Sequence, residues 1–573
     1  MRIGLLTEGG YPYVSGDARH WCDRLVRGLD RHEFDVYALS RGRHQEAECR
    51  VPLPPQVRRV RTAPLWTAED DGVAYGRRAR RRFAECYGEL AAAVTAGDGA
   101  GAGARADAAS DAAPASGDLA DRFGSALYGL AELARENGGL VGALRSDAAV
   151  RALERACHAP RAPRTAHEAR VPDLLAVAAH LERALRPLSL DWYGDDGLGA
   201  ADLCHATTGG PAALCGLLAR HFSDVPLLVT EYGVQLRSHY LTLGPDAAAP
   251  AVRALLAAFH GRLAAEVYRR AAILTPGNAH ARRWQERCGA DRARIRTVYP
   301  GMEADRFTEA GESPDRADPD TLVWVGRVEP AKDLVSLLHA FAEVRKEHPE
   351  ARLRIVGAPS GAEGAAYLGH CRALAAQLFP DEAEGAHAVG DNPVSFEEIG
   401  APEAPTLPDA YAVGAVVVLS SVVEGFPISL VEAMLCGRAT VSTDAGAVVE
   451  VIGGTGLVVP PRNPRALAEA CVALLRDPER RARLGAAARA RALELFTVEQ
   501  NIAAFHGIYL EIVSRCPVRR VVLDESGEPL PFATPAESHV PGRWTRPTPR
   551  VIPGWATNTP VRATPLATAE GAR

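Results

Sequence analysis

The chain has 573 residues, of which 47% are hydrophobic and 24% are charged, and its formal net charge is −6. This length suggests two large domains rather than a single core. The ordinary composition and the small net charge exclude the global basic field of a nucleic-acid-binding protein, so we expect no nucleic acid partner.

Six strand-like runs lie in the first half of the chain, each followed by a turn or polar break and then a helical pattern. They cover residues 2–7, 34–40, 202–208, 226–233, 271–277 and 295–301. Alternation of apolar strands with amphipathic helices is typical of a doubly wound parallel sheet. We therefore predict an N-terminal Rossmann-like α/β domain over residues 1–310.

A mostly helical insertion, at about 65–195, separates the second and third of these strands. It contains an Ala/Gly-rich stretch at about 95–118 whose composition cannot build a core, and we predict a disordered linker there. The basic run at 76–83 leaves two interpretations open, a solvated helix face and a surface that touches a membrane or an anionic polymer. Base rates favour the helix face.

A second set of strand-like runs predicts a C-terminal Rossmann-like domain over residues 311–494. The runs cover residues 321–327, 351–358, 387–391, 415–421, 439–446 and 456–461. An amphipathic helix follows at 495–515. The remainder, 517–573, is rich in Pro, Thr and Arg, and we predict that it is disordered.

Cysteine usage and the apolar runs indicate the compartment. The eleven cysteines form no Cys-x-x-Cys pair and no metal-ligand spacing, which is typical of free thiols in a reducing compartment. The start of the chain shows no signal-peptide pattern. The longest apolar stretch, at 410–419, is far shorter than the roughly 20 residues of a spanning helix and is interpreted as a buried strand. We expect a cytoplasmic protein, with peripheral contact at the inner face of the membrane left open.

The stretch "EGFPISLVE" follows an apolar strand and places Glu424 before, and Glu432 inside, a helix predicted over 427–436. Pro427 suits the first helical position, where its missing N–H costs nothing. The free N–H groups of Ile428, Ser429 and Leu430, with the helix dipole, would form a phosphate site. The two flanking carboxylates could then accept hydrogen bonds from hydroxyls on both sides of a sugar nucleotide. For the two glutamates alone, the simpler interpretation is that Glu424 faces solvent and that Glu432 forms an ion pair with Arg438.

A second motif, "VGRVEPAKD", follows the first strand of the second domain and makes a ligand-binding site the better interpretation. Ligands of open α/β sheets bind outside the carboxyl ends of the strands, and both motifs stand at such ends. Arg327 and Lys332 are five residues apart, beside Gly326. A guanidinium fork and an ammonium can neutralise the charge that develops on a departing diphosphate.

On these motifs the sequence resembles the retaining GT-B glycosyltransferases of family 4, over both domains. The resemblance implies two Rossmann-like domains that face a central cleft, with the helix at 495–515 crossing back to the first domain. It implies that Glu424 lies at the donor sugar, Glu432 at the ribose, and Arg327 and Lys332 at the diphosphate. The donor-binding set would comprise Gly16, Gly326, Arg327, Lys332, Glu424, Gly425, Phe426, Pro427, Ile428, Ser429, Leu430 and Glu432.

More narrowly, the N-terminal half is similar to the glycosyltransferases of Pel-type exopolysaccharide synthesis. The similar segments are residues 7–21, residues 227–241 and the helical insertion. Two positions depart from the pattern: Asp17 follows Gly16 where the family has a glycine pair, and Tyr232 replaces a histidine. A carboxylate near a diphosphate is unfavourable unless it points away.

Two further residues end strands of the first domain and are candidates for the acceptor side. We predict that His205 faces the cleft and has a catalytic role. The alternative, given equal weight, is that it is a structural hydrogen-bond partner. Glu231 could contact acceptor hydroxyls, or it could be a buried ion-pair member.

The resulting hypothesis is a retaining hexosyltransferase that needs no metal and no cofactor. It would move a sugar from a nucleotide diphosphate donor, with UDP-glucose as the guess, to a carbohydrate or other hydroxyl acceptor. Exopolysaccharide or glycoconjugate synthesis with membrane-associated partners is the expected setting. A sugar-nucleotide epimerase and a non-catalytic subunit of a polysaccharide assembly are the alternatives.

Overall fold

The computed structural model describes residues 1–13, 19–47, 51–66, 71–96, 116–160, 162–242, 248–313, 317–379 and 392–518. Gly16, Asp17 and the strand expected at 387–391 lie outside the described residues, as do most of the linker expected at 95–118 and of the tail expected at 517–573.

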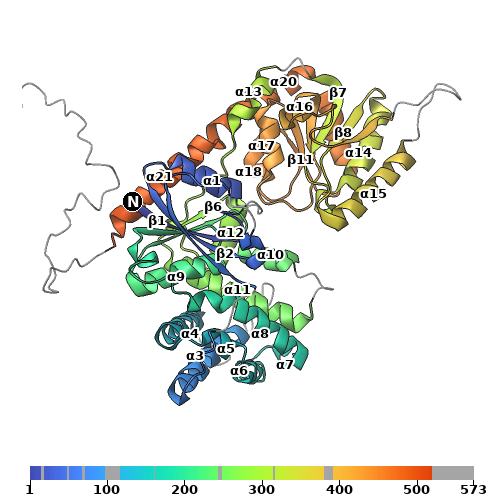
Figure 1. The fold of residues 1–573 in the computed structure, drawn as a ribbon. Coiled ribbons are helices and arrows are strands. Elements are labelled where there is room, and N and C mark those ends of the chain that lie inside the picture. Colours follow the sequence, from blue (N-terminus) through green and yellow to red (C-terminus); the bar gives the residue numbers. More distant parts are fainter. Residues whose placement is uncertain are drawn as a thin grey trace, which may run out of the picture. The chain divides into compact units, whose positions relative to one another are not determined.

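The first sheet has six parallel strands in the order β3-β2-β1-β4-β5-β6 (Figure 1). The strands are β1 (Arg2–Glu8), β2 (Glu33–Ser40), β3 (Val57–Pro64), β4 (Leu203–Ala206), β5 (Leu227–Glu231) and β6 (Ile273–Pro276). In β1, Ile3 is level with Phe34 on one side and with Leu203 on the other. The strand order reverses between β1 and β4, so the ends of these strands form a topological switch point.

Within the described ranges, six α-helices belong to this domain outside the insertion. They are α1 (Arg19–Gly28), α2 (Arg43–Ala47), α9 (Pro211–Ser223), α10 (Gln235–Thr242), α11 (Pro250–Arg270) and α12 (Ala279–Arg287). Helix α9 begins with a proline at a position that needs no N–H, and nine of its residues are buried. Burial all round fits its place beside β1 and β4.

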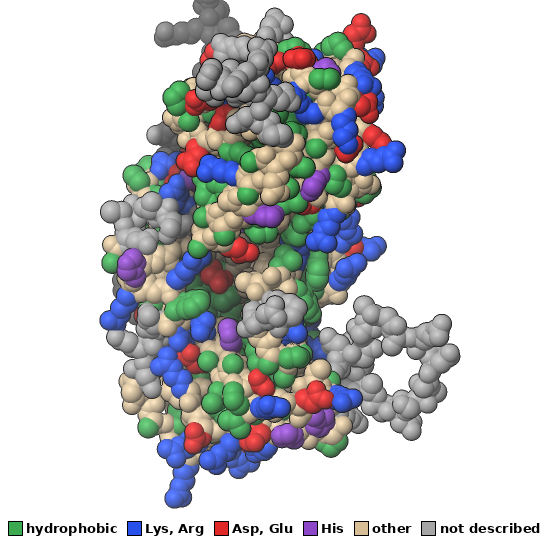
Figure 2. Space-filling view, turned by 90° about the vertical axis from the view of Figure 1, so that its right-hand side faces the viewer, with side chains coloured by type: hydrophobic (Ala, Val, Ile, Leu, Met, Phe, Trp, Pro, Cys, Tyr) green, Lys and Arg blue, Asp and Glu red, His purple; other side chains and the backbone are tan. Residues whose placement is uncertain are grey.

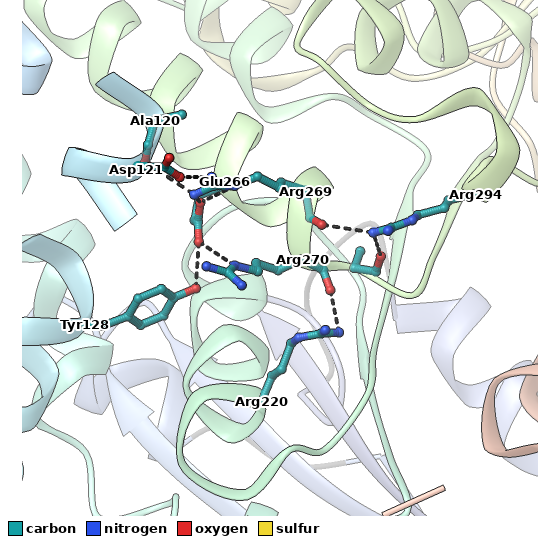
Figure 3. A network of polar contacts seen from close by, with 9 residues as sticks. Ala120, Asp121, Tyr128, Arg220, Glu266, Arg269, Arg270 and Arg294 are labelled. Carbon is teal, nitrogen blue, oxygen red and sulfur yellow. Dashed lines mark hydrogen bonds and ion pairs between the residues drawn. The ribbon is translucent and has the colours of Figure 1, made fainter. Parts of the chain in front are cut away.

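The insertion forms a helical layer between β3 and β4, gathered against α11 (Figure 1). Its helices are α3 (Arg77–Thr95), α4 (Ser116–Asn137), α5 (Leu140–Leu144), α6 (Asp147–Cys157), α7 (Arg164–His167) and α8 (Val171–Leu185). A polar network joins α4 to α11 (Figure 3). Glu266 is buried and accepts hydrogen bonds from Tyr128 Oη at 2.9 Å and Arg270 Nε at 3.0 Å, while Arg269 bridges Glu266 and Asp121. These charge-assisted contacts hold the insertion on the sheet domain.

The second sheet repeats the topology of the first, with strand order β12-β11-β10-β7-β8-β9. Its parallel strands are β7 (Asp318–Val325), β8 (Arg352–Val356), β9 (Val394–Glu397), β10 (Gly414–Leu419), β11 (Ala439–Thr443) and β12 (Leu457–Val459). Its helices are α13 (Thr308–Glu312), α14 (Leu334–Glu347), α15 (Gly361–Leu378), α16 (Leu407–Ala412), α17 (Ile428–Leu435), α18 (Val448–Ile452), α19 (Pro464–Leu475) and α20 (Pro478–Leu495). The switch point of this sheet lies between β7 and β10.

The last described helix, α21 (Val498–Arg515), packs on the N-terminal sheet. Phe505, Tyr509 and Ile512 are buried in one cluster with Leu5 and Val36. The C-terminal end of the described chain is therefore part of the N-terminal core.

The predicted fold class is confirmed, because both sheets are parallel, six-stranded and accompanied by helices. Four strands or strand-like runs differ from the prediction, and one of them is β9, which lies outside every predicted run. Strand β3 was missed, and the insertion consequently follows the third strand rather than the second. Residues 295–301 are not a strand: beyond a single bridge at Ile295, they follow β6 through only two hydrogen bonds, from Arg296 N to Leu274 O and from Val298 N to Pro276 O. The apolar stretch at 410–419 contains the end of α16 before β10 starts at Gly414.

Positive and negative side chains are interspersed over the face that Figure 2 shows. The basic run at 76–83 opens α3, and Arg77, Arg78, Arg80 and Arg81 are exposed there, as the solvated-face interpretation predicts. Within the part of the chain that the structure describes, none of the helices combines the length and apolar character needed to span a bilayer.

Candidate active site

The loops after β7 and β10 meet at the switch point of the C-terminal sheet, because these strands are neighbours in the sheet. Val422 N donates a hydrogen bond to Ala331 O at 2.9 Å, and Ser420 Oγ donates to Lys332 O at 2.7 Å. Gly326 directly follows β7, and its carbonyl is approached so closely that a side chain at Gly357 would lie 1.8 Å from it. The two sequence motifs therefore form one site.

A buried ion pair lies at the centre of this site. Lys332 Nζ contacts Glu424 Oε1, which also accepts a hydrogen bond from Ser421 Oγ at 2.7 Å. Glu424 is 8% exposed, and the side chain of Lys332 is 16% exposed. Solvent screens such a pair weakly, so each charge depends on the other. Ser421 is a site residue that the sequence reasoning missed.

Arg327 differs from Lys332 in being exposed. Its guanidinium has no hydrogen-bond or ion-pair partner among the described residues, although it stands one position after Gly326. An exposed, unpaired guanidinium beside a neutralised ion pair is available to an incoming anion.

Helix α17 begins differently from the prediction. Pro427 is the N-cap rather than the first helical residue. Ile428 N donates to Phe426 O at 3.0 Å and Leu430 N donates to Pro427 O at 3.1 Å, so the prediction that both N–H groups are free is wrong. Ser429 N has no acceptor within the described ranges and is the one N–H of the predicted three that remains available.

The turn before α17 is fixed by packing. The carbonyl of Gly425 accepts a hydrogen bond from Ala447 N at 3.1 Å, and the ring of Phe426 lies edge-on to Phe496 at 5.7 Å. Gly446 has a φ of +60°, and a side chain there would lie 2.3 Å from Glu424 O. This close approach fixes the position of the Glu424 backbone and does not involve the Glu424 carboxylate.

Glu432 lies on α17 and accepts a hydrogen bond from Tyr411 Oη at 2.8 Å. Tyr411 is fully buried at the end of α16. Burial raises the pKa of Glu432, and the Tyr411 hydrogen bond and the nearby Arg306 oppose that shift. Tyr411 was not identified from sequence because its segment was assigned to a strand.

Arg237, on α10 of the N-terminal domain, also contacts the Glu424 segment. Its Nη2 donates a hydrogen bond to the carbonyl of Glu424 at 3.1 Å, and burial lowers the pKa of this arginine. Arg237 brings an N-terminal-domain side chain to the loop after β10, and the sequence carried no signal for it.

His205 does not face the site, so that prediction was wrong. It is 0% exposed within β4, and its ring nitrogens are hydrogen-bonded to Tyr509 Oη and to Thr230 Oγ1, both at 2.7 Å. Burial lowers its pKa to about 3. A neutral histidine with both nitrogens occupied is the structural hydrogen-bond partner that was the stated alternative.

Glu231 is 1% exposed, and Glu8 stands nearby at the end of β1. Glu231 Oε2 accepts hydrogen bonds from Tyr268 Oη at 2.6 Å and Gln285 Nε2 at 2.9 Å, so it is buried without the cation that an ion pair requires. Glu8, which was not singled out from sequence, accepts a hydrogen bond from Thr208 Oγ1 at 3.3 Å, and burial raises its pKa to about 7. None of Glu8, Glu231 and His205 takes part in the ion pair between Lys332 and Glu424.

Tyr232 has a structural place. Its hydroxyl accepts a hydrogen bond from Asn501 Nδ2 at 3.1 Å, and its ring lies edge-on to Trp21 at 5.1 Å. Tyr232 thus helps to hold α21 on the N-terminal domain.

Two family models match consecutive parts of the chain. Residues 1–293 match the model described as "Domain of unknown function (DUF3492)", and residues 319–477 match "Glycosyl transferases group 1". The second match contains both motifs of the candidate site.

Individual proteins are similar to part of the chain. A D-inositol 3-phosphate glycosyltransferase of Streptomyces bingchenggensis is 32% identical over 236 residues, which cover 39% of this chain and 49% of that protein. The protein of the same name from Kineococcus radiotolerans is 34% identical over 225 residues, covering 36% and 49%. The chain spans about half the length of these curated relatives.

A solved sucrose-phosphate synthase from Thermosynechococcus elongatus superposes on 90% of this chain and 99% of its own, with a TM-score of 0.51 at 16% identity. This likeness establishes the fold alone. It agrees with the two Rossmann-like sheets in showing the GT-B fold.

Proposed function

The chain belongs to the family described as "Domain of unknown function (DUF3492)", and on that premise we propose that it is a glycosyltransferase whose donor site is in the C-terminal domain. The match of residues 319–477 to glycosyl transferases group 1 supports this proposal. The observation that carries it is the Lys332–Glu424 ion pair at the switch point of the second sheet, with the unpaired Arg327 in the same loop as Lys332.

The donor is a nucleoside diphosphate sugar, with UDP-glucose as the specific proposal. Arg327 and Lys332 bind the diphosphate, and Ser429 N offers one further donor from the start of α17. Glu432 accepts hydrogen bonds from the ribose hydroxyls, and Glu424 lies at the donor sugar. Lys332 would then share its charge between Glu424 and the diphosphate, which weakens the ion pair when the donor is bound.

The reaction exchanges one glycosidic bond for another. The bond between the anomeric carbon and the diphosphate oxygen breaks, and the acceptor oxygen bonds to the same carbon with retention of configuration. The departing diphosphate oxygen takes the proton of the acceptor hydroxyl. Arg327 and Lys332 stabilise the negative charge that grows on the diphosphate, and such preorganised charges supply a large part of the rate enhancement in many enzymes.

The acceptor is a carbohydrate hydroxyl in exopolysaccharide synthesis. The similarity of the N-terminal half to Pel-type glycosyltransferases supports this choice. The names of the curated relatives point to a phosphorylated inositol instead, but this chain covers only about half of their length.

The test is a product assay with the full chain and UDP-glucose, GDP-mannose or ADP-glucose, each with a tetrasaccharide or inositol 3-phosphate as acceptor. Release of the nucleoside diphosphate together with a lengthened acceptor is expected for UDP-glucose. An Arg327→Ala variant should have much weaker activity, and Arg465→Ala, at an exposed arginine on α19, should keep the wild-type activity. Conversion of a sugar nucleotide into an isomer without any acceptor would contradict transfer and support an epimerase.

A further inference from the structure

A cavity of about 380 Å³ lies at the carboxyl ends of β2 and β3, beneath the helical insertion. Its floor includes Leu39 of β2 and Pro64 of β3, and its roof includes Val141 of α5 and the segment after α8. The carboxyl edge of a parallel sheet is where α/β domains bind ligands. The volume lies in the range of about 300–1,000 Å³ that is usual for small-molecule sites.

Arg186 lines this cavity and is 6% exposed. Its Nε and Nη2 donate to the two carboxylate oxygens of Glu182 at 2.7 and 2.8 Å. Its Nη1 is buried and has no hydrogen-bond partner among the described residues. A buried charged donor left unsatisfied is costly, and an oxygen acceptor from a ligand in the cavity would satisfy it.

The charged side chains that line the cavity, Arg186 included, sum to zero. Arg43 faces it together with Glu46 and Asp71, and Ser189 adds a hydroxyl. Glu46 Oε1 already accepts a hydrogen bond from Ser40 Oγ at 2.8 Å, and Asp71 Oδ2 accepts one from Gly139 N at 2.6 Å. Mixed donors and acceptors between apolar walls suit a neutral polyhydroxyl compound better than an anion.

Hydrogen bonds link one wall of the cavity to the loop after β1, at the switch point of the N-terminal sheet. Gly9, the residue after β1, donates from its N–H to Leu39 O at 2.8 Å, and its carbonyl accepts from Gln45 Nε2 at 3.0 Å. Gln45 is next to Glu46, which lines the cavity. Trp66, one residue beyond the cavity-lining Leu65, is 60% exposed, and the guanidinium of Arg183 stacks 4.2 Å from its ring centroid.

We propose that this cavity binds one or two sugar units of a carbohydrate acceptor, with Arg186 Nη1 donating to a sugar oxygen. The inference rests on the proposed transferase function and deepens it, because it places recognition of the acceptor chain on the insertion. A saccharide bound there would lie on the same strand edge as Glu8.

Binding is measured by saturation-transfer NMR on the full chain with cellotetraose, maltotetraose and N-acetylchitotetraose. Wild-type protein should bind at least one of them. Ser189→Phe obstructs the cavity from an exposed position and should weaken binding at least tenfold. Ser514→Phe is the matched control, because both serine hydroxyls donate to the carbonyl three residues earlier, at 2.9 and 3.1 Å. Arg186→Lys, which keeps a cation for Glu182 but removes the Nη1 donor, should weaken binding about tenfold.

A KM measurement separates this proposal from the function on which it rests. Ser189→Phe should raise the acceptor KM while UDP affinity and UDP-glucose hydrolysis stay unchanged. Absence of binding by all three saccharides, equal binding by Ser189→Phe, or binding of inorganic phosphate alone would overturn the cavity proposal. Saccharide binding by a chain that neither binds nor consumes a nucleotide sugar would overturn the transferase function and leave the cavity proposal standing.

Discussion

The two sheets share one strand order but differ in the polar side chains that their strands carry near the carboxyl ends. After β7 and β10 the structure places an exposed arginine and a lysine paired with a glutamate. Along β4 and β5 it places His205 and Glu231, both closed off from solvent, with α21 packed over His205. The topology provides a crevice in each domain, and the local chemistry makes the C-terminal one suited to an anionic donor.

Lys332→Ala should have the largest effect, because it removes the positive charge from the diphosphate and leaves Glu424 buried without its partner. Turnover is expected to fall by about 10²–10³-fold, the range found when a preorganised charge-stabilising group is lost. Initial rates of nucleoside diphosphate release measure it. Lys346→Ala, at an exposed surface ion pair, is the control. Unchanged turnover of Lys332→Ala would remove the diphosphate role from this residue.

Arg327→Ala sharpens the comparison, because this arginine is exposed and unpaired in the described structure. Loss of hydrogen bonds to a charged group predicts about 10–100-fold weaker activity. The melting temperature should stay within about 1 °C of the wild type, since surface substitutions rarely change stability. A large drop in melting temperature with full activity per folded molecule would make Arg327 a structural residue.

His205→Gln tests the buried side of the comparison. The folded pKa of His205 is lowered to about 3, so the unfolded state binds the proton first as pH falls below about 6.5. The wild type should therefore lose about 2 kcal/mol of stability between neutral pH and pH 5 from this residue alone. Denaturant unfolding at both pH values should show less acid destabilisation in His205→Gln than in the control His370→Gln, an exposed histidine. An unchanged pH dependence would mean that His205 is not held neutral.

Arg237→Ala should have the smallest effect. It removes one hydrogen bond, to the carbonyl of Glu424, which is worth about 0.5–1.5 kcal/mol. A twofold to tenfold rise in the donor KM is expected from steady-state kinetics, with kcat less affected. A loss as large as that of Lys332→Ala would give Arg237 a direct role in the reaction.

Much of the fold could be predicted because the signal is local. The apolar strand at 415–419, for example, is buried on both faces and reads as a continuous hydrophobic run. Strand β3 escaped because "VRRVRTAP" is an edge strand rich in arginine, with only Ala63 buried. Its charge suits an edge and hides the apolar pattern.

The candidate site divides in the same way. Arg327, Lys332 and Glu424 could be identified because each follows a strand end, and the sheet brings the two loops together. The partners of His205 and Glu432 could not, since Tyr509 is 304 residues from His205 and Tyr411 lies in an apolar segment interpreted as a strand. The start of α17 was mispredicted because Ile428 N and Leu430 N donate hydrogen bonds to the carbonyls of Phe426 and Pro427. No residue pattern signals these bonds.

The most direct test of the donor site is calorimetric titration of the full chain with UDP, GDP and ADP at neutral and mildly acidic pH. We predict that UDP binds, that Glu432→Gln weakens this binding, and that Glu469→Gln, at an exposed site on α19, does not. Because burial raises the pKa of Glu432, wild-type affinity should start to fall at a higher pH than an ordinary glutamate would allow, and the Glu432→Gln variant should lose that pH dependence. UDP binding that is equally strong in Glu432→Gln would contradict the placement of the donor at this switch point, and absence of binding by all three nucleotides would contradict the transferase itself.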